Sequence, residues 1–523
     1  MKAQLKRWLF LTHRWLGIGG CVLFAMWFAS GIVMMYVGYP KLTDAERLAH
    51  LPALSQKAPL LAPAVALART GVTGPLDGLR LAASRGGRAV YVVTPVPVAG
   101  AKSGAIVIDA ISGARLASAN AAQALASAAA WAGPGVTVHY QDVIDEDAFT
   151  HSRGLDAQRP LHRVEVIDAD RTLLYVSGKS GEVVRDATRS EQLWNYAGAW
   201  IHWLYPFRGN VFQPYWTSIV NYLAIAGIAA ALSGTVAGIL RWRFRAPYRS
   251  GARTPYPGAM MRWHHVTGLL FALVTIAWIF SGLMSMNPWR IFDTGAPKLR
   301  MEALQGGPLT LTGQDAAPPA LLAASSGAMR ELRWVRVLGQ NRVLAYSAGG
   351  APQVLDSHAA RPVTLDAAGL RAAAARLVDA PVARVEQLGT YDLYYYARDA
   401  HTMMGGAARP LPILRLVFAD AHATWVHLDP HTGAVLGHID SGKRTSRWLF
   451  AMLHSWDWLP LLERRPLWDI VLVVLSLGGL LLSVTGVVIG WRRLGKKLRT
   501  AGVNPPRAAA PAQHPVPAAG RRG

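Results

Sequence analysis

The sequence contains one cysteine, Cys21, among 523 residues, and only 16% of its residues are charged. A single cysteine excludes intramolecular disulfides, and it also excludes thiolate metal sites in the loops, because such sites need several thiolates. Acidic residues are scarce too, with 31 Asp and Glu against 54 Lys and Arg. No nucleic-acid-binding motif accompanies the formal net charge of +23, so we expect no nucleic-acid partner.

Long apolar runs are abundant instead, and hydrophobic residues make up 52% of the chain. A helix needs about 20 apolar residues to cross a hydrocarbon core about 30 Å thick. Four segments satisfy this length: Trp8–Val37, Tyr215–Leu240, Val266–Met286 and Leu467–Trp491. The first is too long for a signal peptide and has no small-residue cleavage site, so we expect it to stay as an anchor. The sequence therefore predicts a membrane α-helical bundle of four transmembrane helices.

The basic residues predict the orientation of these helices. They cluster before the first span, between the second and third, and after the fourth: Lys2, Lys6, Arg7; Arg241, Arg243, Arg245, Arg249, Arg253, Arg262; Arg492, Arg493, Lys496, Lys497, Arg499. Because cytoplasmic loops carry the excess of Lys and Arg, we expect both termini in the cytoplasm and the two long loops outside. In a bacterial inner membrane the loops would be periplasmic, and part of the positive charge would contact anionic membrane lipid.

This topology predicts an order of segments along the chain. The segments are the N-terminus and first span (1–37), a first outer domain (38–190), an interfacial segment and second span (191–240), a cytoplasmic loop (241–262), a third span (263–287), a second outer domain (288–445), an interfacial segment and fourth span (446–495), and a cytoplasmic tail (496–523). The end of the tail is rich in Pro and Ala, which favours disorder.

The chain also carries an internal repeat. The first span reads H-R-W-L-G from His13, and its His, Trp and Ser-Gly residues recur 251 positions later in the third span. The second and fourth spans match in the same way at an offset of 252. The matched pairs are His13/His264, Trp27/Trp278, Ser30/Ser281, Gly31/Gly282, His202/His454, Pro214/Pro466 and Trp216/Trp468. We infer an internal duplication of a helix, outer domain, helix unit, with a pseudo-two-fold axis along the membrane normal.

The outer loops contain three segments that alternate apolar and polar residues into a Gly-containing turn: Ile106–Leu116, Leu173–Val184 and Thr424–Leu436. Such alternation is typical of β-hairpins. With the Ala-rich helical stretches upstream, it favours a small α+β module, one helix on an antiparallel sheet, occurring up to twice per loop. Unrelated short hairpins remain an alternative for the first loop and for residues 308–360.

Four histidines lie at the ends of the spans, and the repeat pairs them at matched depths. His13 and His264 belong to the cytoplasmic face, and His202 and His454 to the outer face. Two neutral imidazoles on facing helices are the ligand set of a bis-histidine haem, so we predict two haem b groups with these four residues as iron ligands. The alternative is that the histidines are interfacial anchors within an aromatic belt of tryptophans.

Neighbouring residues would complete the inner haem site. His264 and His265 point about 100° apart on a helix, so only one can reach a given iron. His264 is the predicted ligand because it aligns with His13, and His265 and Arg14 would then meet a haem propionate. Gly17 and Gly268 lie four residues after the ligands and would let the macrocycle approach the backbone, although close helix packing explains such glycines equally well.

Several longer stretches resemble the PepSY-associated transmembrane family. They are H-R-W-L-G at 13–17, Y-D-L-Y-Y-Y at 391–396, R-P-L-P-I-L-R-L-V-F at 409–418, W-V-H-L-D-P-H-T-G at 425–433 and L-H-S-W-D-W at 453–458. The resemblance implies two extracytoplasmic α+β PepSY-like domains. It also implies an iron-regulated inner-membrane protein. Some members of the family are haem-containing reductases that release iron from ferric siderophores on the periplasmic side.

These observations favour a transmembrane haem-dependent reductase of a ferric siderophore or other ferric complex. No G-x-G-x-x-G turn follows a strand, so electrons would come from membrane quinol or a separate cytoplasmic donor. Tyr394, Tyr395, His401 and Met403 are candidate substrate-binding residues in one loop, where a copper site is an alternative. The hairpin residues His422, His427, His431 and His438 lack ligand spacing, and we expect them in solvent.

Two other functions remain open. The outer domains could be PepSY-type binding or regulatory domains that the helices only anchor, without redox activity. A permease is expected to have polar or broken helices at mid-membrane. The spans have only small hydroxyl side chains there, such as Ser30, Ser233 and Ser281, so transport is the least favoured function.

Overall fold

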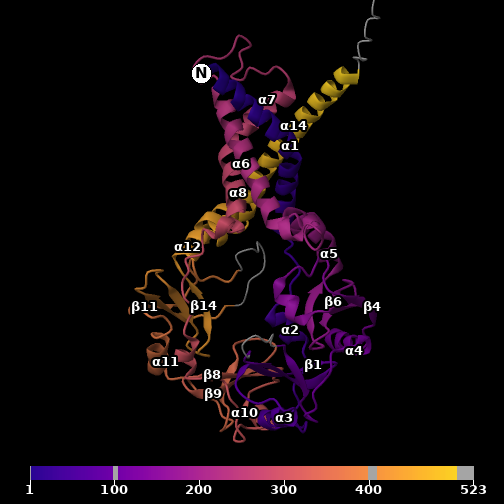
Figure 1. Ribbon diagram of the computed structural model, residues 1–523, viewed down its shortest axis with the longest axis vertical. Coiled ribbons are helices and arrows are strands. Elements are labelled where there is room, and N and C mark those ends of the chain that lie inside the picture. The colour runs from indigo at the N-terminus through magenta and orange to yellow at the C-terminus, as the bar shows by residue number, and fades with distance from the viewer. Residues whose placement is uncertain (1, 98–103, 399–408, 503–523) are drawn as a thin grey trace, which may run out of the picture. The chain divides into compact units, whose positions relative to one another are not determined.

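The computed structural model describes residues 2–97, 104–398 and 409–502 (Figure 1). The chain divides into two compact units. The first comprises Met1–Ala25, Ala226–Ile276 and Leu477–Gly523, and the second comprises Met26–Ile225 and Ala277–Ser476.

Three helices are long and apolar enough to cross a membrane, with candidate spans at Ala3–Met34, Gln213–Arg241 and Leu467–Lys497. They correspond to α1 (Lys2–Met34), α6 (Trp216–Arg241) and α14 (Leu467–Gly502). Their bounds agree closely with three of the predicted spans. The chain is therefore a membrane protein.

The third predicted span is not one continuous helix. It consists of α7 (Ala259–Leu270) and α8 (Ala272–Ser285), which are bent by 67° at Phe271. The Phe271 ring lies against α14 at Gly478, where a side chain would collide with the ring. This contact occurs at the bend. The local sequence does not predict the bend, because the segment contains no proline. The pair provides a fourth span if both halves count as one.

The second unit contains three antiparallel sheets (Figure 1). One has six strands in the order β10-β9-β8-β1-β2-β3, and the other two have the orders β4-β5-β6-β7 and β11-β12-β13-β14. The strands are β1 (Leu76–Arg85), β2 (Arg88–Pro95), β3 (Ile106–Asp109), β4 (Val138–Ile144), β5 (Leu161–Val166), β6 (Leu173–Ser177), β7 (Val183–Ala187), β8 (Glu331–Val337), β9 (Gln340–Tyr346), β10 (Gln353–Asp356), β11 (Val382–Leu388), β12 (Ile413–Phe418), β13 (Trp425–Leu428) and β14 (Val435–Ile439).

A short helix precedes each of four strand groups. These helices are α3 (Pro63–Arg69) before β1–β3, α4 (Ala121–Ala132) before β4–β7, α10 (Pro318–Ala324) before β8–β10 and α11 (Ala367–Ala374) before β11–β14. The module of one helix and an antiparallel set of strands therefore occurs twice per loop. It occurs in the first loop and in residues 308–360 as well, where the sequence left unrelated hairpins open.

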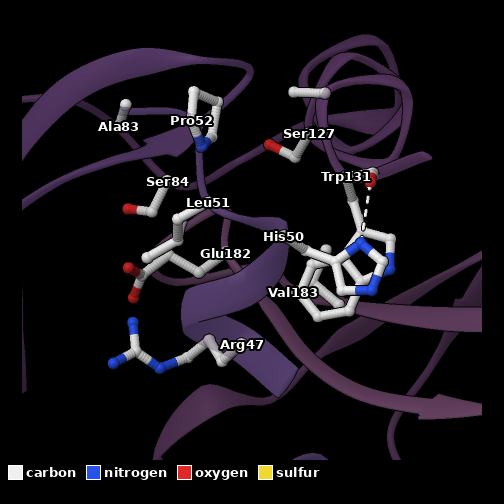
Figure 2. A pocket seen from close by; sticks show the side chains of 11 residues that line it. Arg47, His50, Leu51, Pro52, Ala83, Ser84, Ser127, Trp131, Glu182 and Val183 are labelled. Carbon is white, nitrogen blue, oxygen red and sulfur yellow. Dashed lines mark hydrogen bonds between the residues drawn. The ribbon is translucent and has the colours of Figure 1, made fainter. Parts of the chain in front are cut away.

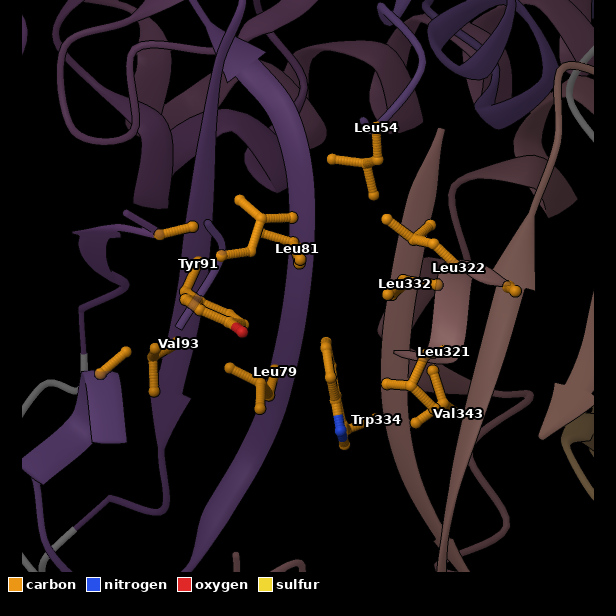
Figure 3. Packing of buried hydrophobic residues seen from close by; sticks show 14 of the residues in the cluster. Leu54, Leu79, Leu81, Tyr91, Val93, Leu321, Leu322, Leu332, Trp334 and Val343 are labelled. Atoms are coloured by element: carbon orange, nitrogen blue, oxygen red, sulfur yellow. The ribbon is translucent and has the colours of Figure 1, made fainter. Parts of the chain in front are cut away.

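Strands β1 and β8 join the two outer segments, which the sequence placed in two separate domains. They pair antiparallel with Leu79 opposite Trp334 and Leu81 opposite Leu332. These four side chains are buried in one hydrophobic cluster with Tyr91 of β2, and Figure 3 shows them gathered along the strands. Fully burying one large apolar side chain contributes about 1.5–3 kcal/mol, so the two segments stabilise each other through a shared core.

A buried ion network crosses the same sheet. Glu331 of β8 is fully buried and accepts two hydrogen bonds from Arg47 of α2 (Asp44–His50), at 2.7 and 3.1 Å. Arg80 of β1 and Arg333 of β8 also pair with Glu331, and Arg80 binds Glu182 before β7. Burial alone would raise the pKa of Glu331, but the hydrogen bonds and charge of Arg47 and the charges of Arg333 and Arg80 outweigh it and lower the pKa to about 2.

A small pocket lies beside this network, and Figure 2 shows Arg47 and Glu182 on its wall. On the other side the imidazole of His50 stacks on Trp131 of α4, with ring centroids 4.1 Å apart, and binds the Trp131 carbonyl through Nδ1. The pocket therefore lies where α2 packs against both of the first two modules.

The remaining helices are short. They are α5 (Arg189–Asn195), α9 (Met301–Gln305), α12 (Ser441–Arg447) and α13 (Leu459–Leu462), with 3-10 turns at Arg153–Gln158, Tyr205–Phe207, Gln213–Tyr215 and Pro288–Arg290. Five-residue π-helical turns follow α5 at Tyr196–Trp200 and α12 at Trp448–Met452. Each of these π-helical turns leads directly to one of the outer histidines.

Candidate functional site

The inner histidine pair lies in the first unit. His13 of α1 faces His264 of α7, with ring centroids 6.2 Å apart and ring planes 30° apart. His13 Nδ1 lies 3.1 Å from the carbonyl oxygen of Ala230 in α6. His264 Nδ1 lies 3.1 Å from Thr485 Oγ1 and 3.3 Å from the Leu482 carbonyl oxygen in α14. Each imidazole is therefore fixed by a helix other than its own.

The outer pair lies in the second unit. His202 faces His454 with ring centroids 6.3 Å apart and ring planes 71° apart. His202 Nδ1 lies 2.9 Å from Ser30 Oγ of α1, and His454 Nδ1 lies 3.0 Å from Ser281 Oγ of α8. The structure therefore contains the two predicted pairs of histidines. Their role as iron ligands stays a prediction.

The hydrogen bonds of the hydroxyl groups define the tautomer of three histidines. Ser30, Ser281 and Thr485 each donate their own O–H to a backbone carbonyl of their helix, at 2.7, 3.1 and 2.7 Å. Each hydroxyl oxygen must then accept a hydrogen bond from the histidine Nδ1–H. The Ala230 carbonyl oxygen can only accept, so His13 Nδ1 must also carry a hydrogen and donate it. All four imidazoles therefore carry their lone pair on Nε2, the nitrogen that binds a metal when Nδ1–H is held in this way.

The spacing of each pair fits one iron atom between two imidazoles. A metal–imidazole bond is about 2 Å long and a ring nitrogen lies about 1 Å from the ring centre, so axial ligands of one iron have ring centres roughly 6 Å apart. The observed separations are 6.2 and 6.3 Å. A haem supplies the four remaining iron ligands from its own ring, so two histidines are a sufficient protein contribution.

Glycines make room for these imidazoles. A Cβ on Gly234 of α6 would lie 2.5 Å from His13 Cε1, so only glycine lets His13 reach Ala230. A Cβ on Gly31 would lie 3.7 Å from His202 Cε1, and one on Gly282 the same distance from His454 Cε1, which is ordinary van der Waals contact, so these two glycines adjoin the imidazoles without being required by them. Gly234 was not predicted as a site residue, although its position four residues after Ala230 on one helix face is a signal for such a contact.

The two glycines predicted to admit a macrocycle differ in their surroundings. No described heavy atom lies within 4 Å of a Cβ built on Gly17, whereas a Cβ on Gly268 would meet Leu482 Cδ1 at 3.4 Å. The backbone beside His13 is therefore open, and the backbone beside His264 is lined by α14.

The two predicted propionate partners differ in burial. His265 is buried, with Nδ1 2.7 Å from Thr254 Oγ1 and Nε2 2.9 Å from the Gly238 carbonyl oxygen. Both ring nitrogens are thus taken by the loop after α6 and by α6 itself, and neither is left for a propionate. Arg14 is exposed. The separation of His264 from His265 follows the helical rotation that the sequence implied.

The candidate substrate residues are only partly on the surface. Tyr395 is fully buried, and its hydroxyl donates to the Pro410 carbonyl 2.8 Å away, so it does not have the exposed position that its predicted role assumed. Tyr394 is half-buried, and its hydroxyl oxygen accepts a hydrogen bond from Trp448 Nε1 at 2.9 Å. His401 and Met403 lie outside the described residues.

One hairpin histidine is not in solvent as expected. His427 of β13 is 3% exposed, and its Nε2 accepts a hydrogen bond from Arg415 Nε at 2.9 Å. Burial and the charge of Arg415 lower the pKa of His427 to about 4. Arg415 also binds Asp392, whose carboxylate accepts from the backbone N–H groups of Tyr394 and Tyr395. His427 thus belongs to a polar group that holds the tyrosine stretch on the sheet.

Comparison with protein families gives one match. The family described as PepSY-associated TM region matches residues 10–351 of the chain. No curated protein matches the sequence.

Proposed function

We propose that this chain, which belongs to the PepSY-associated transmembrane family, is a di-haem b electron-transfer protein of the bacterial inner membrane. It reduces a ferric complex, such as a ferric siderophore, at the periplasmic face. In this proposal the bent pair α7 and α8 counts as one of four spans, both termini are cytoplasmic, and anionic lipid surrounds the basic ends.

The observation that carries the proposal is the set of four Nδ1 hydrogen bonds. Metal-bound histidines almost always donate their second ring N–H to a fixed acceptor, and these four do so in pairs at a spacing that suits one iron. An interfacial anchor would need neither a fixed tautomer nor a partner imidazole facing it. The geometry therefore favours ligation over anchoring.

The internal duplication is supported by contacts that recur at the offsets of 251 and 252 seen in the sequence. Ser30 and His202 are bonded as Ser281 and His454 are. Trp216 Nε1 donates to the Trp203 carbonyl at 2.9 Å, and Trp468 Nε1 donates to the Ser455 carbonyl at 3.0 Å, 252 residues later. The outer site is accordingly built from two copies of one local structure.

Each haem, when bound, supplies an iron that takes up and passes on one electron. The chain's own part is to hold both axial imidazoles as neutral ligands and to surround them with helices that exclude water. Reduction of one ferric ion needs one electron, so one quinol, which gives up two electrons and two protons, would serve two ferric complexes. The product is ferrous iron, which siderophores hold more weakly.

The decisive measurement is a reduced-minus-oxidised absorption spectrum of the purified protein. We expect the α and Soret bands of low-spin bis-histidine haem b, with about two haems per chain, and their loss in stages in H13A and H454A. Purified protein without such bands would contradict the proposal. It would leave the second candidate, a membrane-anchored binding or regulatory protein, for which both variants would keep full function.

A further inference from the structure

The first compact unit, which holds the inner histidine pair, has no acidic side chain. All 31 Asp and Glu residues of the chain lie outside its three segments, 1–25, 226–276 and 477–523. The loop between α6 and α7, residues 242–258, carries four arginines and is called the basic loop below: Arg243, Arg245, Arg249 and Arg253. Figure 1 shows this loop extending past the ends of both helices. No carboxylate side chain of its own unit can therefore pair with these arginines.

The basic loop is folded by its own hydrogen bonds. The Arg243 N–H donates to the Arg253 carbonyl at 2.9 Å, and Arg253 NH1 donates back to the carbonyls of Arg243 and Phe244 at 3.0 and 2.6 Å. The Tyr248 N–H donates to the Ala252 carbonyl at 2.8 Å. The rule that places Lys and Arg on the cytoplasmic side of a membrane concerns charge and requires no such fold. The loop thus presents its arginines on a defined backbone.

The basic loop is also fixed to the helices beside the inner site. Thr254 Oγ1 lies 2.7 Å from Nδ1 of the buried His265. The rings of Trp242 and Tyr256 meet the same imidazole edge-on, with ring centroids 5.6 and 5.4 Å away. His265 directly follows the predicted iron ligand His264. A protein that binds the basic loop is therefore held near the inner histidine pair.

Basic residues at the helix ends have different surroundings from those in the loop. The guanidinium carbon of Arg241 lies 4.8 Å from the ring centre of Phe10, and Lys497 Nζ lies 5.1 Å from that of Trp15. Cations beside aromatic rings at the ends of spans are typical of the membrane interface. Arg245 and Arg249 are exposed instead, and neither has a hydrogen bond, ion pair or ring contact with another residue that the structure describes.

We propose that the basic loop is the docking site of a small acidic electron-transfer protein of the cytoplasm. Opposite charges steer such an encounter, and arginine and aromatic side chains are enriched at the centre of protein interfaces. Phe244, which is 64% exposed between Arg243 and Arg245, supplies an apolar contact there. This inference rests on the proposed function and identifies its electron donor. The reduced partner is oxidised by one electron at each encounter, and each electron serves the reduction of one ferric ion outside.

The test measures how fast reduced partners deliver electrons to the full-length protein in nanodiscs of phosphatidylcholine, a lipid without net charge. The probes are two acidic low-potential proteins, a flavodoxin and a [2Fe–2S] ferredoxin, mixed with the oxidised protein by stopped flow. We expect the second-order rate constant to fall as the ionic strength rises from about 20 mM to about 200 mM. The double variant Arg245→Gln, Arg249→Gln should lower this constant about tenfold at low ionic strength.

The matched control is the double variant Lys6→Gln, Arg7→Gln. It removes the same charge from exposed positions of α1 in the same unit and should change the rate constant less than about twofold. The uncharged donor decylubiquinol provides a second comparison, because its rate should be the same in the wild type and both variants. The inference is overturned if both double variants reduce at equal rates with the acidic probes.

Anionic lipid is the competing occupant of the basic loop. If the loop binds lipid instead, the two double variants behave alike with both probes. R245Q/R249Q then loses the increase in Tm that phosphatidylglycerol nanodiscs give over phosphatidylcholine nanodiscs, and K6Q/R7Q keeps it. This result also overturns the inference.

A binding measurement that needs no haem separates this inference from the proposed function. The Kd of the oxidised flavodoxin and ferredoxin for the protein in phosphatidylcholine nanodiscs should rise about tenfold in R245Q/R249Q and change little in K6Q/R7Q. If the protein contains no haem but shows this difference, the docking site stands and the proposed function fails. If haem is present and neither probe binds, the docking site is refuted and the proposed function is unaffected.

Discussion

Replacing Ser281 by alanine isolates the hydrogen bond that orients His454. The Ser281 hydroxyl oxygen is the acceptor of His454 Nδ1–H at 3.0 Å, and its own proton goes to the Trp278 carbonyl. Alanine removes this acceptor at a position where the Ser281 side chain is fully buried. A buried donor that loses its partner costs about 1–3 kcal/mol. Loss of such an outer contact weakens metal binding about 10–100-fold, which corresponds to about 1.4–2.8 kcal/mol.

The assay is haem retention by the purified protein, followed by the α band as free haem is removed with an apoprotein acceptor. Under the proposed function, in which the chain binds two haems, we expect S281A to lose one haem about 10–100-fold faster than the wild type and to keep the other. Ser285→Ala is the control, because the Ser285 hydroxyl donates to the Gly282 carbonyl within its own helix. If S281A retains haem like the wild type while H454A does not, Ser281 does not orient the ligand and the tautomer assignment is wrong.

Three further changes test other parts of the structure. G234A should displace His13, because its Cβ would lie 2.5 Å from Cε1, and under the proposed function it should remove the spectrum of the inner haem. G19A, with no described atom within 4 Å of its Cβ, should leave the spectrum unchanged. E331Q should lower the unfolding free energy by about 3 kcal/mol at neutral pH, because a pKa held at about 2 against an ordinary 4.5 stabilises the fold above pH 4.5. That stability is lost in the wild type as pH falls from about 4.5 to about 2, and denaturant midpoints for E331Q should lack this loss. W334A should lower the free energy of unfolding by about 3–5 kcal/mol and make both outer segments more susceptible to proteolysis, because Trp334 fills the core that they share. Cleavage of one segment alone would contradict the shared core.

Sequence reasoning reached the spans and the histidine pairs because both are encoded locally. Apolar runs are read along the chain, and the repeat relates His13 to His264 without any knowledge of the fold. Helix geometry indicated that His264 and His265 cannot both reach one iron, and the alignment with His13 in the repeat selected His264. The Ser-Gly pairs at 30–31 and 281–282 were visible as repeated letters, but their role as hydrogen-bond acceptors required knowledge of which helices meet.

The remaining features depend on contacts between distant segments. Ala230 and Leu482 act through their backbone carbonyls, and every residue has such a carbonyl, so the residue type does not predict this role. The pairing of β1 with β8 joins strands about 250 residues apart, and short strands carry little information about their partners. His427 lies in a hairpin whose alternating pattern allows either face to be buried. The hydrogen bond from Arg415 on the neighbouring strand indicates that the face carrying His427 is the buried one.

The acceptors of the four Nδ1–H groups also predict the direction of electron flow under the proposed function. Both inner histidines have a helix backbone carbonyl as an acceptor, from Ala230 for His13 and from Leu482 for His264, and His264 also contacts the side-chain hydroxyl of Thr485. The outer histidines donate to serine hydroxyls. An amide carbonyl is the stronger acceptor, so it makes the imidazole a more basic ligand, which stabilises ferric over ferrous iron.

The inner haem should therefore have the lower reduction potential, and electrons should pass downhill from the cytoplasmic side to the outer side. Spectroelectrochemical titration of H13A and H454A, each of which keeps one haem, should give the higher midpoint for H13A, the variant that retains the outer site. The reverse order would mean that burial and local charge outweigh the acceptors. Outward transfer would then need a ferric complex of high reduction potential as the electron acceptor, or an external driving force.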